Sequence, residues 1–571
     1  MMFAFPIIIT MLMKKLTHPL LSLVSMGICA LLVGQSALAT TTIKNALEDT
    51  RLGLYEPRSL LLSDGLCKDC STIPQALWYF KKETLAVPGK DSVVSGFSRT
   101  DNAQDDVRQW IVQATPAALN VPSPLIWLGS SKLVEAAHIN EAGNRIKTAT
   151  GEEFEFGIID KIPTNLSYYD DSSRRFFAQR PVRLRGELDA VTGNSQRFIA
   201  RTIWPLDFAI TQNAALQPFA SGENFNQLVR AEHGGARSSF ATRVLWERQP
   251  GAARTWQNKA IVGLMLNGAQ GDDDEAHGGH FAVVTGRYDQ SGDWSRWLVN
   301  NFYNLGSISE KGIIAAATPM DKYLMDLNNG QSYYRPSYML VAVLKDGRVA
   351  EQYQAAIDRV YNHFYRRDFD YDHAKANCSG ISVDTFRTLG WNIPNRGNEG
   401  AAKAIGAYAY VSATKGSLED GRKIYDYMNE EKVRLYPAVA FEVMGADLLN
   451  LGQGQTQRSL SPLEKNLSAD IEALIYVRIP QIPSSRAFGL APVFSFDEYL
   501  KQAPEDRSKW KIVATDPRPF PPELRDGLAL KHETAALIPL PVAFAFASIL
   551  ALLTALVAFI RGKFRKAKRK S

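Results

Sequence analysis

Cysteine is scarce in this sequence, and the residues that would turn its C-x-x-C motif into a metal or haem site are missing. Four cysteines occur among 571 residues. Cys67 and Cys70 form the motif. The chain has no second C-x-x-C, and the residue directly after Cys70 is not a histidine. These absences exclude a four-cysteine zinc site and the attachment of c-type haem. The motif predicts a local disulfide between Cys67 and Cys70, with a redox pair as the alternative.

Acidic residues are absent from both ends of the chain. Residues 1–39 contain two lysines and no Asp or Glu, and residues 537–571 contain seven Lys or Arg and again no acid. Without these nine positive charges, the net charge of +6 becomes about −3 for residues 40–536. The basic character therefore belongs to two terminal segments and gives no support for a nucleic-acid surface. We expect no nucleic-acid partner.

Charges of either sign are missing from a long run near the C-terminus. Residues 537–560 read LIPLPVAFAFASILALLTALVAFI, which is 24 residues without a charged side chain. About 20 apolar residues span the core of a bilayer, so this run predicts a transmembrane helix. The alternative, a buried core helix, would normally show a polar face. Because Lys and Arg stay on the cytoplasmic side, residues 561–571 are predicted to be a cytoplasmic tail.

The N-terminus predicts export of the body of the protein. Lys14 and Lys15 precede an apolar run over residues 20–34, and a small-x-small pattern ends at Ala39. These features are typical of a cleaved secretory signal, which we assign to residues 1–39. An uncleaved anchor is the alternative and leaves the body on the same side. The two ends together predict a single-pass protein of the bacterial inner membrane with its body in the periplasm.

Internal repeats and low-complexity tracts are also absent, so residues 40–536 are expected to form packed domains. Short alternating runs between turn residues predict a β-rich domain over residues 40–215, either a small barrel or a sandwich. Strands and helices mix over residues 216–400, and helical stretches with Pro-rich segments follow over residues 401–536. The expected class is α+β: a β-rich N-terminal domain, a central α+β domain, a mixed helical C-terminal region and one C-terminal transmembrane helix.

Cys378 stands where a thiol can be activated. Asn377 is a favourable N-cap residue, so a helix is predicted to begin at about Cys378 and to stop at Gly390. The free N–H groups and the dipole at a helix start favour the thiolate. His280 follows two glycines at the mouth of a predicted strand. A thiol on a helix start and an imidazole on a neighbouring strand are the two groups that thiol catalysis requires.

A third residue is expected to orient the imidazole. Two predicted strands, HFAVVTGRY and SRWLVNNFYN, are joined by a turn at residues 289–293. If the hairpin is symmetric about this turn, His280 faces residues 301–303. Asn301 is then the orienting group, with Asn300 as the alternative. A slip of one residue in the register would turn these side chains to the other face of the sheet.

Other interpretations of the same residues stay open. Cys378 would be an inert thiol if its helix start were packed in the core. His277 and His280 would be metal ligands if they acted with the acidic run at residues 272–275, although their spacing gives this little support. The aspartates of residues 368–372 lack the Gly and Glu of a calcium loop. The sequence therefore predicts no cofactor and no metal.

The order of elements around these residues is distinctive. His280 begins a strand in GGHFAVV, the strand YMLVAVL and a helix follow, and Asn377-Cys378-Ser379 opens a further helix. This order resembles circularly permuted members of the papain-like NlpC/P60 superfamily. More narrowly, it resembles the periplasmic domain of Lnb-type lipoprotein N-acyltransferases over roughly residues 260–391. The resemblance implies a central papain-like domain with Cys378 and His280 as its catalytic pair.

Together these features predict a thiol-dependent acyltransferase. Cys378 is the expected nucleophile, His280 the general base and then acid, and Asn301 the orienting group. A position at the membrane predicts a lipid or lipoprotein substrate. The same residues would equally serve a cell-wall cysteine peptidase or amidase that acts on peptidoglycan. A non-catalytic scaffold that binds protein partners in the envelope is a further alternative.

Overall fold

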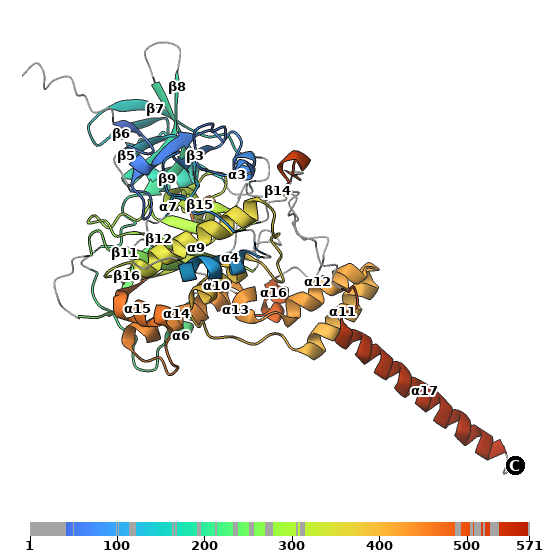
Figure 1. Cartoon of the computed structure of the whole chain (residues 1–571). Helices are drawn as coiled ribbons and strands as arrows, with labels where there is room; N and C mark the ends of the chain where they lie inside the picture. The colour runs from blue at the N-terminus through green and yellow to red at the C-terminus, as the bar shows by residue number, and fades with distance from the viewer. Residues whose placement is uncertain are drawn as a thin grey trace, which may run out of the picture. The chain divides into compact units, whose positions relative to one another are not determined.

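The structure is a computed structural model of the chain, shown in Figure 1. The predicted signal peptide, the acidic run at residues 272–275 and His277 lie outside the residues that it describes. The chain divides into two compact units, residues 1–44 and 45–571, and the description below concerns the second unit. The described residues are 42–48, 51–98, 100, 102–113, 122–162, 165, 168–190, 196–211, 214–231, 238–249, 256–268, 278–303, 307–308, 315–485, 493–502, 506, 516–517, 520–525 and 536–568.

Five strands in the N-terminal part of this unit close into a small barrel. They pair in the order β5-β6-β7-β9-β8, and β5 also pairs with β8, which closes the ring. β7 and β9 are parallel, and the other pairs are antiparallel. This connectivity, with a helix before β8, is the topology of the OB fold, a Greek-key barrel. The elements are β5 (Lys132–Ile139), β6 (Arg145–Thr148), β7 (Glu153–Ile158), α5 (Asp171–Ala178), β8 (Val182–Ala190) and β9 (Gln196–Pro205).

A ten-stranded sheet forms the centre of the unit. Its order is β10-β17-β16-β11-β12-β13-β15-β4-β3-β2, and only the β15–β4 pair is parallel among its described pairings. β11, β12 and β16 are near-continuous apolar runs because both of their faces are covered. The strands are β2 (Leu60–Ser63), β3 (Thr84–Pro88), β4 (Ile126–Gly129), β10 (Ala241–Glu247), β11 (Ala260–Asn267), β12 (His280–Arg287), β13 (Leu298–Asn301), β15 (Ala316–Pro319), β16 (Ser337–Leu344) and β17 (Ile471–Ile479).

The sheet draws strands from each of the three segments that the sequence separated. β2, β3 and β4 come from residues 40–215, and β17 comes from residues 401–536. The class is α+β as predicted, and the barrel accounts for the β-rich N-terminal region. The segments do not, however, form separate sheets, because long-range pairing joins them.

Helices cover one face of this sheet. α9 (Arg348–Tyr365), α10 (Cys378–Leu389) and α14 (Pro437–Gln453) all pack on β12, as the centre of Figure 1 shows. The apolar positions of α9 recur at three and four residues, so one continuous side of the helix meets the strands. α10 begins at Cys378 and ends before Gly390, whose φ of 108° stops the helix, in agreement with the prediction.

The barrel meets the sheet through buried ion pairs. Arg185 of β8 donates two hydrogen bonds, of 3.0 and 3.1 Å, to the Asp321 carboxylate on α7 (Met320–Met325). Both side chains are almost fully buried. Arg201 of β9 likewise donates to Asp326 at 2.8 Å. A buried charge is tolerated when it is paired in this way, and the pairs fix how the barrel and the sheet meet.

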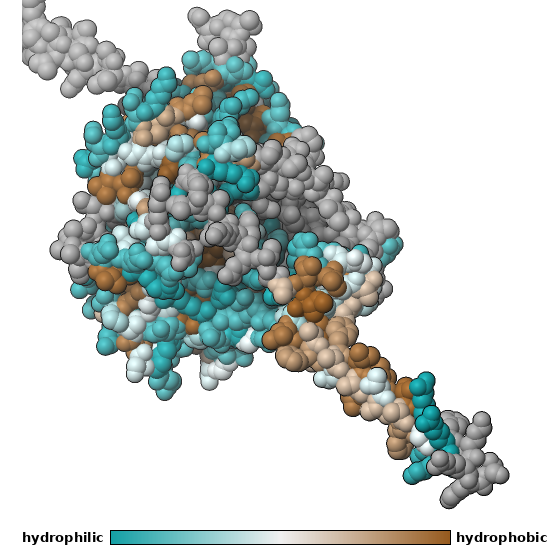
Figure 2. Space-filling model, turned by 45° about the vertical axis from the view of Figure 1, so that its right-hand side comes forward, coloured by the Kyte–Doolittle hydropathy of each residue, from teal (hydrophilic) through white to brown (hydrophobic). Residues whose placement is uncertain are grey.

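The chain ends in a long exposed helix, α17 (Leu540–Lys568). Residues 540–563 are long and apolar enough to cross a membrane, and none of their most apolar window is buried inside the protein. Figure 2 shows this apolar surface ending in hydrophilic residues. The chain just before α17 is held by α11 (Ala401–Lys415) and α12 (Leu418–Asn429). Tyr408 donates to the carbonyl of Leu537 at 3.1 Å, and Arg422 donates to that of Ala536 at 2.8 Å.

The remaining elements are short, and several of them join the larger ones. They are β1 (Ile43–Asn45), η1 (Pro57–Ser59), α3 (Pro74–Tyr79), α4 (Ala103–Gln113), α6 (Phe225–Ala231), β14 (Ser307–Ile308), α8 (Gln331–Tyr334), α13 (Lys432–Leu435), α15 (Pro462–Asp470), α16 (Phe496–Gln502), β18 (Asp516–Pro517) and η4 (Pro522–Leu524).

Candidate functional site

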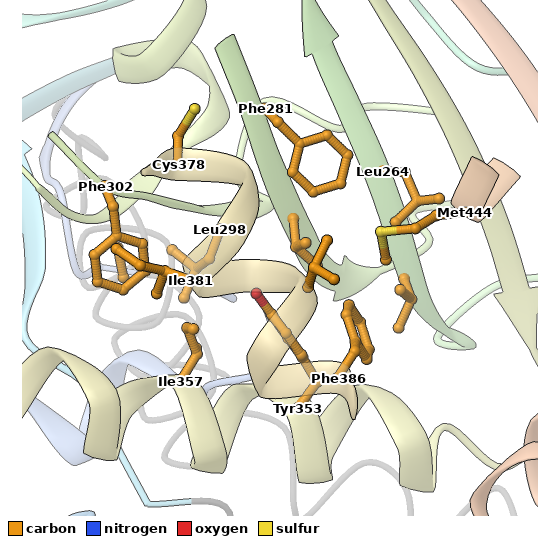
Figure 3. Packing of buried hydrophobic residues seen from close by; sticks show 14 of the residues in the cluster. Leu264, Phe281, Leu298, Phe302, Tyr353, Ile357, Cys378, Ile381, Phe386 and Met444 are labelled. Carbon is orange, nitrogen blue, oxygen red and sulfur yellow. The ribbon is translucent and has the colours of Figure 1, made fainter. Parts of the chain in front are cut away.

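Cys378 is the first residue of α10, and its position is set by the cap before it. Asn377 has extended backbone angles, and its side-chain oxygen accepts the Gly380 N–H at 2.8 Å. The amide group of Asn377 donates at 2.8 Å to the carbonyl of Leu435, which ties the turn to α13. Figure 3 shows the Cys378 side chain projecting from the first turn of α10 and away from Ile381. The cap therefore holds the thiol at the end of the helix.

The thiol is buried but not surrounded by apolar atoms alone. Cys378 is 4 % exposed, and burial raises the pKa of its thiol. The backbone N–H of Phe281 and the hydroxyls of Ser379 and Tyr371 act in the opposite direction on this pKa. The Ser379 hydroxyl lies 3.9 Å from the sulfur. These donors are a set that would stabilise a thiolate once it formed.

His280 is the first residue of β12 and is 2 % exposed. Its ring stacks on Tyr303 with 4.3 Å between centroids, and its Nε2 atom is buried without a hydrogen-bond partner. Burial lowers the pKa of the imidazole well below its usual value, and the charge of Arg335 lowers it further. His280 is therefore neutral at pH 7, which is the state that a general base requires.

The thiol and the imidazole come to the same end of β12. The Phe281 N–H reaches the thiol, and His280 is the residue before it. Side chains alternate along a strand, so His280 projects from the face opposite to Phe281, whose ring belongs to the buried cluster that also contains Cys378 and Ile381. Among the described residues, no hydrogen bond joins Cys378 to His280. The structure thus makes them neighbours at one strand end without a direct link.

The predicted orienting residue, Asn301, lies on β13 beside this site. The pairing of Val283 with Asn300 sets the register, and its continuation puts Tyr303 opposite His280. Asn301 donates at 2.8 Å to the carbonyl of Ala316, and its side-chain oxygen is buried without a partner. The described hydrogen bonds of Asn301 do not reach the imidazole, so its orienting role stays a prediction. The alternative, Asn300, donates at 2.9 Å to Gln354 on α9.

Three polar residues near the site were not singled out from the sequence. Tyr323 on α7 donates to Asn267, which is the β11 partner of His280, and its ring centroid lies 6.4 Å from that of His280. Tyr371 contacts the thiol and accepts from the Cys378 N–H at 3.4 Å. Arg335 follows α8, and its charge adds to the lowering of the pKa of the His280 imidazole. Tyr323 and Arg335 have no local signal in the sequence, because they reach the site from elements distant from both Cys378 and His280. Tyr371 lies seven residues before Cys378, and only the fold shows that its hydroxyl meets the start of α10.

The C-x-x-C motif lies in the loop before α3. The backbone of Cys70 pairs with that of Gly89 in an isolated antiparallel β-bridge. Both cysteines are partly buried and are free thiols in the structure. Burial raises the pKa of Cys70 to about 12, with a further contribution from its contact with Cys67. The two side chains are therefore close together, and the disulfide stays a prediction.

No cluster of three or more His, Cys, Asp or Glu that would hold a metal is present in the described part of the chain. Comparison of the chain with protein-family models, with curated proteins and with solved structures finds no match. The site must therefore be interpreted from its own geometry.

Proposed function

We propose that this chain is a membrane-anchored, extracytoplasmic thiol enzyme that transfers acyl groups through Cys378 and His280. One observation carries the proposal. A thiol at a capped helix start receives the N–H of Phe281, and the preceding residue carries a neutral, buried imidazole with an unpartnered Nε2. Buried polar atoms without partners are rare, and they are concentrated where a protein binds or reacts.

The chemistry begins with proton transfer from the Cys378 thiol to Nε2 of His280. The thiolate attacks the acyl carbonyl, and the oxyanion that forms is stabilised by donors at the start of α10, including the Cys378 N–H, and by the Tyr371 hydroxyl. Collapse expels the leaving group, which takes the proton from His280 and leaves a thioester on Cys378. An acceptor amine then attacks the thioester carbonyl and gives its proton to His280, and the C–S bond breaks as an amide forms. His280 returns the proton to the Cys378 sulfur, which completes acyl transfer. The mechanism requires Nε2 of His280 to reach the sulfur when substrate binds, because no hydrogen bond joins the two groups among the described residues and catalytic hydrogen bonds often tighten only then.

The location of the site favours a lipid or lipoprotein substrate. On this proposal α17 spans the bacterial inner membrane, with its basic end in the cytoplasm and the body in the periplasm. Tethering raises the effective concentration of lipid-borne groups around the body. Attack by water in place of an amine would make the same residues a peptidase or amidase of the cell wall.

The burial of Cys378 favours a second candidate function. A thiol that is 4 % exposed and whose pKa burial raises is also what an inert packing residue would show. In that case the protein is a non-catalytic scaffold of the envelope that binds protein partners. Thiol reactivity separates the two functions.

The test is to incubate the full chain in detergent with an activated acyl ester and to measure acylation by intact mass. In the parent chain we expect one acyl adduct that hydroxylamine removes. Cys378→Ser should form no adduct, and His280→Ala should react about 100-fold more slowly than the parent. His138→Ala is the matched control, because this histidine is exposed on β5 of the barrel, and it should react as the parent does. An adduct that persists in Cys378→Ser, or equal rates in the two histidine variants, would refute the mechanism.

A further inference from the structure

Arg335 is a buried arginine without a counter-ion. It follows α8, is 4 % exposed, and forms no ion pair with any carboxylate in the described part of the chain. Its Nε and Nη1 atoms are both buried and have no hydrogen-bond partner. A charged group removed from water without compensation costs several kcal/mol. A folded protein keeps such a group only where something else repays that cost.

Other buried arginines in the described residues show what normal compensation looks like. Arg185 pairs with Asp321, Arg183 with Glu135 and Asp293, and Arg366 with Asp368. Their side chains are 2–3 % exposed. Arg335 is buried to a similar degree and has no carboxylate among the described ion pairs. The described residues therefore supply no counter-charge for it.

The position of Arg335 links it to the candidate active site. Burial lowers the pKa of His280, and the charge of Arg335 lowers it further. Burial raises the pKa of Tyr323, and the charge of Arg335 opposes that rise. Gln331, one helical turn before Arg335 on α8, donates at 3.0 Å to Tyr303, the ring that stacks on His280. The oxygen of the Gln331 amide is buried without a partner. Unpartnered nitrogen atoms of Arg335 and His280 therefore lie near the same pair of tyrosines.

We propose that Arg335 binds an anionic oxygen group, a phosphate or a carboxylate, of the molecule that reacts at Cys378. A guanidinium offers two parallel N–H donors that match both groups, and in a buried site such bonds are strong. The substrate class is thus an acyl compound that carries a phosphate or carboxylate near its acyl carbon. This inference rests on the proposed function for its reaction but not for its binding.

The test uses the full chain in detergent with the Cys378→Ala substitution, so that binding is measured without chemistry. Inorganic phosphate is added up to 50 mM, and thermal unfolding is followed; the concentration is on the order needed for a weak site whose Kd is about 1 mM. We expect phosphate to raise the Tm by several degrees, and Arg335→Met to abolish this rise. Arg335→Lys should retain a weaker response, because lysine keeps the charge and loses the paired donors.

The basal stability of the variants gives a second, independent measurement. Arg335→Met should be at least as stable as the parent without phosphate, because it removes a charge that has no partner. The matched control, Arg185→Met, should be less stable, because it leaves Asp321 buried and unpaired. A large loss of Tm in Arg335→Met, or a phosphate response that Arg335→Met retains, would overturn the assignment, as would the absence of any response to the anions tested.

The source of the anion is identified by comparing acetate, inorganic phosphate and mixed micelles containing phosphatidylglycerol or the neutral lipid diacylglycerol. A response to phosphatidylglycerol but not to diacylglycerol assigns the group to a phospholipid, and a response to acetate alone assigns it to a carboxylate. A response to inorganic phosphate without one to the lipid assigns it to a soluble phosphate. Anion binding through Arg335 in a chain whose Cys378 fails to acylate would refute the proposed function and leave this site standing. Acylation of Cys378 without anion binding through Arg335 would refute the anion site and leave the proposed function standing.

Discussion

His363 shows how single charged residues hold the helices of this protein together. Its two ring nitrogens lie 2.7 Å from carboxylate oxygens of Asp106 on α4 and of Asp368 after α9. Burial opposes the charged imidazole, but these two carboxylates outweigh burial and raise the pKa of His363. Arg359 and Arg366 pair with the same two aspartates. The two carboxylates therefore favour the protonated imidazole, and the contact with Asp106 ties α9 to α4.

The raised pKa of His363 predicts a pH dependence of stability. The stabilisation is fully present below the unfolded pKa of about 6.5 and is lost as the pH rises through the higher folded pKa. We expect His363→Gln to lower the free energy of unfolding by about 2 kcal/mol at pH 6. The free energy of unfolding that His363→Gln loses should become smaller as the pH rises. Chemical denaturation at pH 6 and pH 9 measures this, and a loss that grows with pH would show that the imidazole is neutral in the folded chain.

At the scale of elements, the first turn of α10 connects folding to chemistry. Asn377 both caps the helix and ties it to α13, so the position of the Cys378 thiol depends on one side chain. The sequence predicts this start because capping is a local property. The register of the β12–β13 hairpin is harder to predict. A symmetric turn puts His280 opposite residues 301–303, and the observed pairing continues to Tyr303, at the end of that range.

Removal of the α10 cap should loosen the thiol. Asn377→Ala is expected to lower stability by about 1 kcal/mol and to speed the alkylation of Cys378, because the first turn frays. Ser417→Ala is the matched control, since Ser417 caps α12 by accepting the Asp420 N–H at 3.1 Å. It should lower stability by a similar amount and leave Cys378 labelling unchanged. Iodoacetamide labelling followed by peptide mass analysis measures both, and equal labelling in the two variants would contradict the role of the cap.

At the scale of the whole molecule, α17 contributes no residue to the large hydrophobic core cluster. Its apolar window is exposed, and nothing in the described core depends on it. The body, in contrast, is joined by pairings such as that of β16 with β17, whose residues are more than 100 positions apart. If α17 anchors the chain as proposed, attachment and folding of the body are therefore separable.

Truncation after Ala536 should release the protein from the membrane. The full chain is expected to stay in the membrane fraction after carbonate extraction, because a 24-residue apolar helix is anchored by its hydrophobic area. The truncated chain is expected in the soluble fraction with an unchanged Tm. Deletion of the basic residues after Ile560 is the control and should leave attachment intact. A truncated chain that resists extraction would place the anchor elsewhere.

The sequence by itself determined the features that depend on neighbouring residues. These are the α+β class, the apolar helix near the C-terminus and the start of α10 at Cys378, and each rests on periodicity, apolar length or capping. The tertiary structure alone decided the closure of the barrel through β5 and β8, the entry of β17 into the central sheet, and the burial of Arg335 without a carboxylate. The physical reason is that strand pairing and burial are set by packing between residues far apart in the chain. No local pattern records which of them will meet.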